Sequence, residues 1–456
     1  MMRTLAKFAE ACGGRLQGAD RGYTGVSTDT RTLAAGELFV ALRGPRFNGN
    51  EFVAAAHAAE AAGAVVDAPQ ATPIAQVLVA ESQAALTRAA QNWRSRFDIP
   101  VIGVAGSNGK TSTKEMTAAI LTRAGATLAT RGNLNNHIGV PLTLLRLAPE
   151  HRFAVIEMGA NQLGDVAALV EVAAPNIGLI TNAGAEHLEG FGSLEAVARA
   201  EGEVIETLPP TGTAVINADD SYAELWRGMT PAQVVDFGIG ARASWRAQGV
   251  SCDVDAQGFK TRFTLVSPLG TAAVVLELAG RHNVMNALAA AAAAAAAGAS
   301  LEHILLGLAG VRAVPGRLQF KRAMSGAWLI DDSYNANPSS VRAGIEVLAQ
   351  LDGKRWLVLG DMAELGDFSQ ASHAEIGAFA REQGIERLFA TGALTAGTVE
   401  SFGAGGQWFP DTQALSAALI ASSNSGVRML VKGSRVNRLE HVVEALTAAP
   451  ARQRPE

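Results

Sequence analysis

The stretch VIGVAGSNGKTSTKEMTAAI, residues 101–120, decides the fold of this chain. It begins with a short apolar run typical of a buried strand, continues through a glycine-rich turn, and ends in a segment typical of a helix. A glycine turn between a strand and a helix presents backbone N–H groups to an anion, which is how proteins hold nucleotide phosphates. We therefore expect a parallel α/β sheet that carries a nucleotide site.

The glycine-rich turn departs from the standard Walker pattern. That pattern places two glycines around four residues before Lys-Ser/Thr, and here Val104 stands in the first glycine position. Gly106 and Gly109 still allow the backbone to turn its N–H groups inward. Lys110 can reach the β- and γ-phosphates, and the hydroxyl of Thr111 can ligate Mg²⁺. The alternative is an ordinary strand–turn–helix junction.

The composition excludes several classes of protein. With 456 residues, of which 48% are hydrophobic, the chain has enough apolar material for about three domains. The net charge of −5 argues against nucleic-acid binding, which needs a basic face. Two cysteines, Cys12 and Cys252, cannot form a disulfide framework and favour a cytoplasmic location. We see no signal peptide, and the alanine-rich run at 286–298 predicts a packed helix rather than a membrane span.

Strand-like and helix-like segments alternate along the chain in three blocks, which we expect to be domains covering residues 1–82, 83–313 and 314–456. The last boundary lies near Pro315 and Gly316, which interrupt a helical pattern. Strands that alternate with helices predict parallel sheets. The expected fold is α/β, with a small N-terminal domain, a central P-loop-type parallel-sheet domain that binds ATP, and a Rossmann-like C-terminal domain.

Two side chains outside the phosphate loop are candidates for a metal site. Glu157 ends an apolar strand-like segment, where an unpaired carboxylate would be costly, so it is a natural Mg²⁺ ligand. His187 follows the next strand-like segment, at the edge where open α/β sheets bind ligands. The alternatives are a carboxylate that points to solvent and a structural or surface histidine.

Together these pieces resemble the Mur ligases, the ATP-dependent amide-forming enzymes of peptidoglycan synthesis. GSNGKTSTKE, GNLNNHIGVPLTLL, EMGAN, NAGAEHLEGFGS and GRHNVMNALAA match the central domain, and PGRL, DDSYNANP, GDMAELG and KGSR match the C-terminal domain. The N-terminal STDTR and GELFVALRGPRFNGNEFV resemble the domain that binds the UDP-muramoyl substrate. GNLNNHIGVP, DDSYNANP and GDMAELG favour the last ligase of the series, which adds D-alanyl-D-alanine to UDP-N-acetylmuramoyl-tripeptide.

The resemblance implies a role for each matching residue. The implied ATP contacts are Gly106, Ser107, Asn108, Gly109, Lys110, Thr111, Ser112, His282, Asn283, Asn286, Arg317 and Asp332. The implied substrate contacts are Asp29, Arg31, Asn48, Gly49, Asn135, Asn136, His137, Tyr334 and Asn335. Thr111 and Glu157 would hold a first Mg²⁺, and His187 a second. Among the alternatives, Asp29 is a turn residue, Asn283 a helix cap, and DDSYNANP a strand end followed by a turn.

One position departs from the family. A lysine in the helix after HLEGFGS is usually carbamylated in Mur ligases, and its carbamate helps to bind the second Mg²⁺. Glu201 occupies that position here, and there is no lysine between Ser193 and Leu208. We expect Glu201 to act as a built-in anion in the catalytic set with Lys110 and His187, reaching Mg²⁺ through a water or a small helix shift. The alternative is a solvated helix residue beside Glu203.

The resemblance also implies a reaction. ATP would phosphorylate the terminal carboxylate of the UDP-linked tripeptide, and the amine of D-alanyl-D-alanine would attack the resulting acyl phosphate. We expect a monomer that contacts neither nucleic acid nor the membrane interior. Two alternatives stay open: another ligase of this architecture, such as the third-residue-adding or a folylpolyglutamate-type enzyme, and a nucleotide-binding protein that has lost ligase activity.

Overall fold

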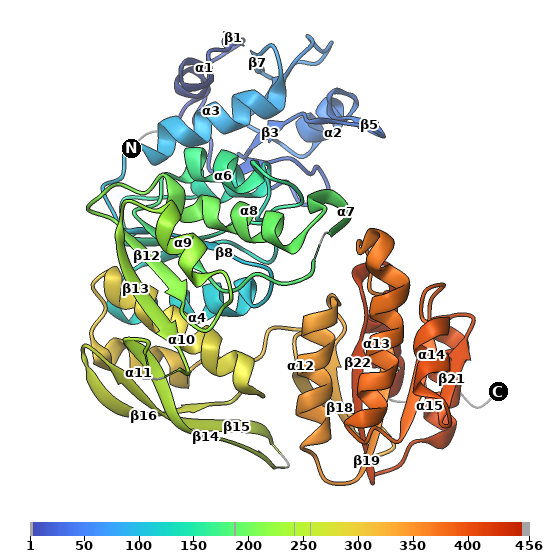
Figure 1. The fold of residues 1–456 in the computed structure, drawn as a ribbon. Coiled ribbons are helices and arrows are strands. Elements are labelled where there is room, and N and C mark those ends of the chain that lie inside the picture. The colour runs from blue at the N-terminus through green and yellow to red at the C-terminus, as the bar shows by residue number, and fades with distance from the viewer. Residues whose placement is uncertain (1–2, 187, 241, 256, 449–456) are drawn as a thin grey trace, which may run out of the picture.

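The computed structural model describes residues 3–448 except 187, 241 and 256. Figure 1 shows three successive blocks, each built from a sheet and its helices, with the C-terminal block (orange to red) beside the central one. Helix α12 (Pro338–Ala349) lies on the side of the C-terminal block that faces the central block. The expected domain boundaries stay a prediction, although each main sheet lies within one expected domain.

The N-terminal block contains, in the described part of the chain, a five-stranded sheet of order β1-β7-β6-β3-β2. Strand β6 pairs in parallel with β3 and β7, and only the β1 edge is antiparallel. The elements up to the phosphate loop are α1 (Leu5–Cys12), β1 (Arg15–Gln17), β2 (Val26–Ser27), β3 (Leu38–Val40), β4 (Arg43–Gly44), β5 (Phe47–Asn48), η1 (Gly49–Phe52), α2 (Val53–Ala58), β6 (Gly63–Val66), β7 (Gln76–Leu78) and α3 (Ser82–Arg94).

The central sheet has nine strands among the described residues, in the order β16-β15-β14-β13-β12-β11-β8-β10-β9. Strands β9 to β13 and β8 are parallel, as expected, and consist of short apolar runs. The elements are β8 (Val101–Ala105), α4 (Lys110–Ala124), β9 (Thr127–Ala129), α5 (Gly139–Leu144), β10 (Phe153–Glu157), α6 (Asp165–Ala173), β11 (Ile177–Ile180), α7 (Leu188–Phe191), α8 (Leu194–Glu206), β12 (Thr213–Asn217), α9 (Ala223–Met229), β13 (Gln233–Gly238), β14 (Trp245–Asp255), β15 (Gly258–Ser267), β16 (Gly270–Leu276), α10 (Arg281–Ala296) and α11 (Leu301–Ala309).

An antiparallel extension of this sheet, β14 to β16, was not part of the sequence expectation. Buried and exposed positions alternate along these strands, which is the pattern of a sheet with one face in water. Polar residues at exposed positions, such as Gln248, Ser251, Asp253 and Arg262, interrupt the apolar pattern in β14 and β15, so these two strands lack the short hydrophobic runs that mark the parallel strands.

Helices cover both faces of the central sheet and create two separate cores. One face packs against α5, α6 and α8, with α3 packed on α5 and α6, and the other face packs against α4, α10 and α11. In α10, Ala289 to Ala294 are buried, and the small side chains let this helix pack closely against both the sheet and the neighbouring α4. The prediction of a packed alanine-rich helix is therefore confirmed. The described residues contain no helix that is both long and apolar enough to span a bilayer.

The C-terminal block contains a six-stranded sheet, counted over the described residues, of order β17-β18-β22-β19-β20-β21. Only the β17 edge pairs in the antiparallel sense. The elements are β17 (Gln319–Arg322), β18 (Trp328–Asp332), α12, β19 (Lys354–Leu359), η2 (Gly366–Phe368), α13 (Ser369–Glu382), β20 (Arg387–Thr391), α14 (Ala396–Phe402), β21 (Gly406–Phe409), α15 (Thr412–Ser422), β22 (Val427–Lys432), η3 (Arg435–Asn437) and α16 (Glu440–Thr447).

The carboxyl ends of strands from both larger sheets meet at one cavity. Glu157 at the end of β10 and Asn217 at the end of β12 line it from the central sheet. Asp332 at the end of β18 and Lys432 at the end of β22 line it from the C-terminal sheet. Open α/β sheets bind ligands at this edge, so the fold itself places the site.

Candidate functional site

The cavity between the central block and the C-terminal block has a volume of about 640 Å³. Its wall combines the turn after β8, the starts of α4, α10 and α12, and the loops after β10, β11 and β18. The residues of this wall that bear on the argument are Ser107, Asn108, Gly109, Lys110, Thr111, Ser112, Asn135, Asn136, Glu157, Thr181, Asn182, Glu186, His282, Asn283, Asn286, Arg317, Asp332, Tyr334, Asn335, Asn337, Ser339 and Lys432.

The turn between β8 and α4 requires glycine at two positions. Gly106 has φ +122° and Gly109 has φ +85°, both in the region that favours glycine. A Cβ at Gly106 would overlap Thr181 Oγ1, and one at Gly109 would overlap Asn286 Oδ1. The turn therefore holds the N-terminus of α4, with its free N–H groups, against the cavity, where an anion is favoured.

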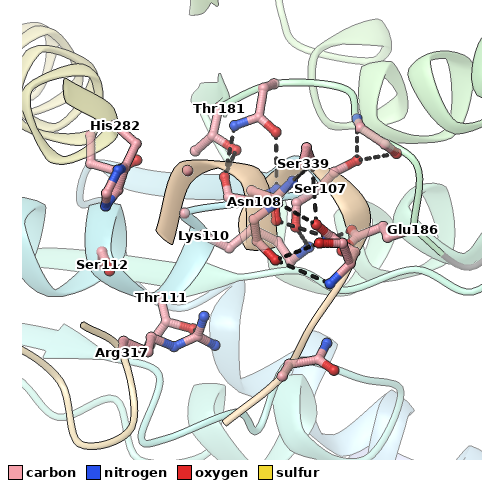
Figure 2. A pocket seen from close by; sticks show the side chains of 18 of the residues that line it. Ser107, Asn108, Lys110, Thr111, Ser112, Thr181, Glu186, His282, Arg317 and Ser339 are labelled. Carbon is pink, nitrogen blue, oxygen red and sulfur yellow. Dashed lines mark hydrogen bonds and ion pairs between the residues drawn. The ribbon is translucent and has the colours of Figure 1, made fainter. Parts of the chain in front are cut away.

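Lys110, the first residue of α4, is held in a strongly acidic setting. Its ammonium donates to Glu186 Oε1 and to Ser107 O, both at 3.1 Å, and also to Gly106 O. Burial acts to lower the pKa of Lys110, but Glu186 and Glu201 outweigh it and raise that pKa above its ordinary value. The ammonium therefore stays charged near pH 7. Figure 2 shows Lys110 at the turn, joined to Glu186 by a dashed line.

Glu157 and Thr111 form a second polar pair beside the turn between β8 and α4. Glu157 Oε1 accepts from Thr111 Oγ1 at 3.2 Å and from Asn135 Nδ2 at 2.9 Å. Glu157 Oε2 is buried, and no group in the described residues hydrogen-bonds to it. A buried carboxylate oxygen without a hydrogen bond, beside a threonine hydroxyl at the phosphate turn, fits a hard cation that needs oxygen ligands.

The start of α10 carries a polar cluster on the cavity side. Asn283 Nδ2 donates to Ala279 O at 2.8 Å and lies 3.2 Å from His282 Nε2, while Asn286 Nδ2 donates to Asn283 Oδ1 at 3.1 Å. Burial, and next the nearby Lys432 ammonium, lower the pKa of His282 to about 4. His282 is therefore neutral near pH 7 and presents an uncharged ring, suited to a heterocyclic base, on the far side of the loop from Glu186.

The C-terminal wall is centred on a buried ion pair. Lys432 Nζ donates to Asp332 Oδ2 at 2.6 Å and to Asn335 O at 2.9 Å. Burial raises the pKa of Asp332, although Lys432 acts in the opposite direction. Arg317 stacks over the ring of Tyr334 at 4.4 Å and donates to Thr111 Oγ1 at 3.2 Å, so this wall directly contacts the phosphate turn.

A second bridge between the blocks, which we call the Asn108 clasp, consists of Asn108, Asn337 and Ser339. Asn108 Nδ2 donates to Ser339 Oγ at 3.0 Å, Ser339 Oγ donates to Asn337 Oδ1 at 3.1 Å, and Asn337 Nδ2 donates back to Asn108 Oδ1 at 2.9 Å. Asn337 is also the N-cap of α12. The turn that would hold phosphates is thus hydrogen-bonded to the start of a helix in the other block.

Comparisons with known proteins agree with this geometry. Residues 22–105 match the model described as "Mur ligase family, catalytic domain", 104–294 the "Mur ligase middle domain" and 316–435 the "Mur ligase, glutamate ligase domain". The chain is 43% identical over 452 residues to the UDP-N-acetylmuramoyl-tripeptide–D-alanyl-D-alanine ligase of Escherichia coli, covering 97% of this chain and 98% of that one. The chain belongs to the Mur ligase family.

Further relatives support the same placement within the Mur ligases. The enzyme of that name from Bacillus subtilis is 35% identical over 461 residues, covering 98% and 99% of the two chains. The crystal structure of MurF from Acinetobacter baumannii has a TM-score of 0.90 at 34% identity, covering 98% and 99%. MurF from Thermotoga maritima in complex with ADP has a TM-score of 0.80 at 25% identity, covering 92% and 96%. The predicted family and three-domain α/β fold are confirmed.

Most residues that the Mur ligase resemblance suggested lie together at the cavity. Lining it are Ser107, Asn108, Gly109, Lys110, Thr111, Ser112, Asn135, Asn136, Glu157, His282, Asn283, Asn286, Arg317, Asp332, Tyr334 and Asn335. Gly106 is buried beneath them, and His137 is exposed outside the cavity wall. His187 falls outside the described residues.

The candidate UDP contacts lie in the N-terminal block, away from this cavity wall. Asp29 and Arg31 form an exposed ion pair at 2.6 Å, and Arg31 lowers the pKa of Asp29 to about 2. Asp29 also accepts from Arg31 N–H at 3.0 Å, so the alternative of a turn residue is correct as local structure and does not exclude a binding role. Asn48 accepts from Asn50 N–H and caps η1, which begins at the buried Gly49.

The structure excludes three of the alternative interpretations. Glu201 is 1% exposed and its Oε2 accepts from Gly106 N–H at 2.6 Å, so it is not a solvated helix residue, and Glu203 is buried as well. Glu157 is 1% exposed and does not point to solvent. Asn283 lies inside α10, whose N-cap is Gly280, so it is not a helix cap.

Sequence reasoning about a Mur ligase missed several cavity residues. Glu186 stands next to the predicted His187, but its ion pair with Lys110 joins positions 76 apart. Lys432 and Ser339 reach the site only because two blocks meet there. The N-cap role of Asn337 could have been found, because Asn before Pro338 is a helix-start signal.

Proposed function

We propose that this chain is an ATP-dependent ligase that joins D-alanyl-D-alanine to UDP-N-acetylmuramoyl-tripeptide and so forms the UDP-pentapeptide precursor of peptidoglycan. The observation that carries the proposal is the full-length identity of 43% with an enzyme named for this reaction. The cavity supports it, because the phosphate turn of the central block and a wall of the C-terminal block face each other there.

The chemistry follows from the weak electrophilicity of a carboxylate. A carboxylate oxygen of the tripeptide attacks the γ-phosphorus of ATP, the bond to the β–γ bridging oxygen breaks, and ADP leaves. The amine nitrogen of D-alanyl-D-alanine then attacks the acyl carbon, the C–O bond to phosphate breaks, and the amine loses a proton. The first step brings two anions together, so positive charge near the γ-phosphate is the main requirement.

The chain provides that positive charge at the phosphate turn. Lys110 carries an ammonium at the first position of α4, and the N–H groups of the same helix end point into the cavity. Arg317 adds a guanidinium from the C-terminal block, 3.2 Å from Thr111 Oγ1. We assign these groups to the γ-phosphate and its transition state.

Mg²⁺ fits the donor set on the other side of the turn. We propose that Thr111 Oγ1 and Glu157 hold the first ion, supported by the buried Glu157 Oε2 that has no hydrogen bond within the described residues. When bound, Mg²⁺ would offset phosphate charge and so reduce the repulsion between ATP and the substrate carboxylate. His187, which is not among the described residues, stays the candidate ligand of a second ion.

Glu201 is proposed to provide the negative charge that a carbamylated lysine provides in other Mur ligases. Its carboxylate lies below the phosphate turn, bonded to Gly106 N–H, and it does not line the cavity. Contact with a second ion would therefore use a water or a small shift of α8. Activity should be independent of bicarbonate, whereas Glu201→Lys should become bicarbonate-dependent. Full activity of Glu201→Ala would contradict the assignment.

We also assign contacts to the tripeptide, to D-alanyl-D-alanine and to the UDP end of the substrate, on the grounds of the Mur ligase resemblance. Asn135 and Asn136 lie on the Glu157 side for the tripeptide, and Tyr334 and Asn335 on the C-terminal wall for D-alanyl-D-alanine. Asp29, Arg31, Asn48 and Gly49 stay proposed contacts of the UDP end. We further propose a monomer in the cytoplasm, supported by a cavity built within one chain and by two free cysteines.

The test is phosphate release with ATP and Mg²⁺, omitting each substrate in turn. We expect release only when both UDP-muramoyl-tripeptide and D-alanyl-D-alanine are present, with a UDP-pentapeptide identified by mass spectrometry. Release that requires a different amine would indicate another ligase of the same architecture. The absence of release under all conditions would indicate a nucleotide-binding protein that has lost the chemistry.

A further inference from the structure

Lys114 is a completely buried lysine one helical turn beyond Lys110. It lies on α4 and its side chain is 0% exposed. Lysine is almost never fully buried unless it is paired, because removing an ammonium from water costs several kcal/mol. The reaction described above assigns Lys114 no contact with ATP or substrate, and it does not line the cavity.

The partners of Lys114 come from three segments of the central block. Its Nζ donates to Thr130 O at 2.8 Å, to Glu115 Oε1 at 2.6 Å and, more weakly, to Gly132 O at 3.4 Å. It also lies 3.9 Å from Glu157 Oε2, the buried oxygen that accepts no hydrogen bond among the described residues. One ammonium thus joins the nucleotide helix, the end of β10 and the segment that follows β9.

That segment, residues 130–136, which we call the asparagine segment, leads directly into the cavity wall. Thr130 Oγ1 accepts from Glu157 N–H at 3.0 Å, and Asn135 O accepts from Gly159 N–H at 2.9 Å. Asn135 Nδ2 bonds to Glu157 Oε1 at 2.9 Å. The segment has little regular structure of its own, so its position relative to Glu157 depends on these contacts and on Lys114.

We propose that Lys114 is a positioning residue that couples the nucleotide site to the site of the UDP-linked tripeptide. It fixes the asparagine segment against α4, and it balances the charge of Glu157 from a buried position outside the cavity wall. A cation or nucleotide bound at Thr111 and Glu157 therefore changes the position of Asn135 and Asn136, because Glu157 and the asparagine segment both contact the Lys114 ammonium. The inference rests on the proposed function only in naming the UDP-linked tripeptide as the ligand of the asparagine segment.

The variants that test it differ in charge and shape. Lys114→Met keeps the length of the side chain and removes every donor, whereas Lys114→Arg keeps the charge. Lys354→Met is the matched control, because Lys354 is an exposed lysine at the start of β19, remote from the cavity wall. Calorimetry measures binding of UDP-muramoyl-tripeptide with and without Mg²⁺ and a non-hydrolysable ATP analogue.

For Lys114→Met we expect tripeptide binding in the presence of the analogue to weaken about tenfold or more, with analogue binding alone changing by less than about threefold. Lys114→Arg should recover part of the loss, and Lys354→Met should equal the wild type. A purely structural lysine would lower the melting temperature without changing tripeptide binding by the folded protein. That result would overturn the proposal.

Hydrogen exchange provides a readout that does not depend on the substrate assignment or on Lys114→Met being stable. Addition of Mg²⁺ and the ATP analogue to the wild type should protect amides of the asparagine segment, and Lys114→Arg should reduce that protection. Equal protection in both proteins would overturn the coupling. If the wild type binds the analogue but not UDP-muramoyl-tripeptide, the proposed function fails, and this exchange comparison still decides the role of Lys114.

Discussion

Glu157 and Glu201 flank the same phosphate turn and are equally buried, each at 1% exposure, yet their surroundings differ. Glu157 ends a strand, lines the cavity and keeps one oxygen free of hydrogen bonds in the described chain. Glu201 lies within helix α8, outside the cavity wall, and bonds to Gly106 N–H. Burial alone therefore does not show whether a carboxylate can contact a cation directly, because that depends on what its free oxygens face.

Their electrostatic partners differ as well. Lys114 and Thr111 lie close to Glu157 and compensate its charge within contact distance. Burial raises the pKa of Glu201 to about 7, and Lys110 only partly offsets this effect. We therefore expect substitution of the two carboxylates to have different effects, and expect the stability contributed by Glu201 to depend on pH.

The largest effect is expected for Glu157→Gln. The change removes the charge but keeps the shape, so Thr111 loses its anionic partner and the cation site is weakened. We expect kcat to fall roughly 100-fold, the loss seen when one preorganised charge-stabilising group is removed, with a higher Mg²⁺ concentration for half-maximal phosphate release. Glu171→Gln, an exposed carboxylate on α6, is the control. An unchanged Mg²⁺ titration would remove the distinction between Glu157 and Glu201.

A smaller effect, on stability, is expected for Glu201→Gln. The folded state raises the pKa of Glu201 from 4.5 to about 7, so it binds this proton more tightly than the unfolded chain does. The associated stability is complete below pH 4.5 and is lost as the pH rises through about 7. Glutamine cannot ionise, so Glu201→Gln should gain up to about 3 kcal/mol relative to the wild type between pH 5 and pH 8.

Urea unfolding at both pH values measures this difference. Glu206→Gln, an exposed position on the same helix, should show no such pH-dependent gain. If the difference between Glu201→Gln and the wild type does not vary with pH, Glu201 does not take up a proton in this range, and the proposed effect of its burial is wrong.

The smallest effect is expected for Ser339→Ala in the Asn108 clasp. The substitution removes one hydrogen bond to Asn108 and one to Asn337, which together are worth about 1–2 kcal/mol at a partly exposed site. We expect kcat to decrease by roughly fivefold or less, while ATP binding in calorimetry stays close to the wild type. Ser422→Ala, which removes a hydroxyl bonded within α15, is the control. A large loss of ATP affinity would show that Ser339 acts on the nucleotide itself.

Local features of the sequence were sufficient for much of the site. The strand before Gly106, the glycines at 106 and 109 and the helix at Lys110 were predicted from neighbouring residues alone. Glu157 was predicted to be buried because it ends an apolar run, and the structure agrees. These features depend on backbone conformation and periodicity, which the chain specifies locally.

Other features depend on groups far apart in the chain. The hydrogen bond from Asn108 to Ser339 spans 231 positions, and the ion pair of Lys432 with Asp332 spans 100. Burial of Glu201 results from packing of α8 beneath the phosphate turn, and the sequence alone left a solvated residue open as the alternative to the built-in anion. The antiparallel strands β14 to β16 were not predicted from the sequence, because one of their faces is exposed.

The ion pair between Lys110 and Glu186 has a consequence for selectivity among anions. Because Glu186 already neutralises the lysine at 3.1 Å, an incoming anion must compete with an internal carboxylate for the same ammonium. A single phosphate ion would gain few contacts to set against that loss, whereas the proposed triphosphate would also contact the helix N–H groups and Thr111. Under the proposed function we therefore expect the turn to favour a triphosphate over abundant small anions, because the triphosphate makes more simultaneous contacts.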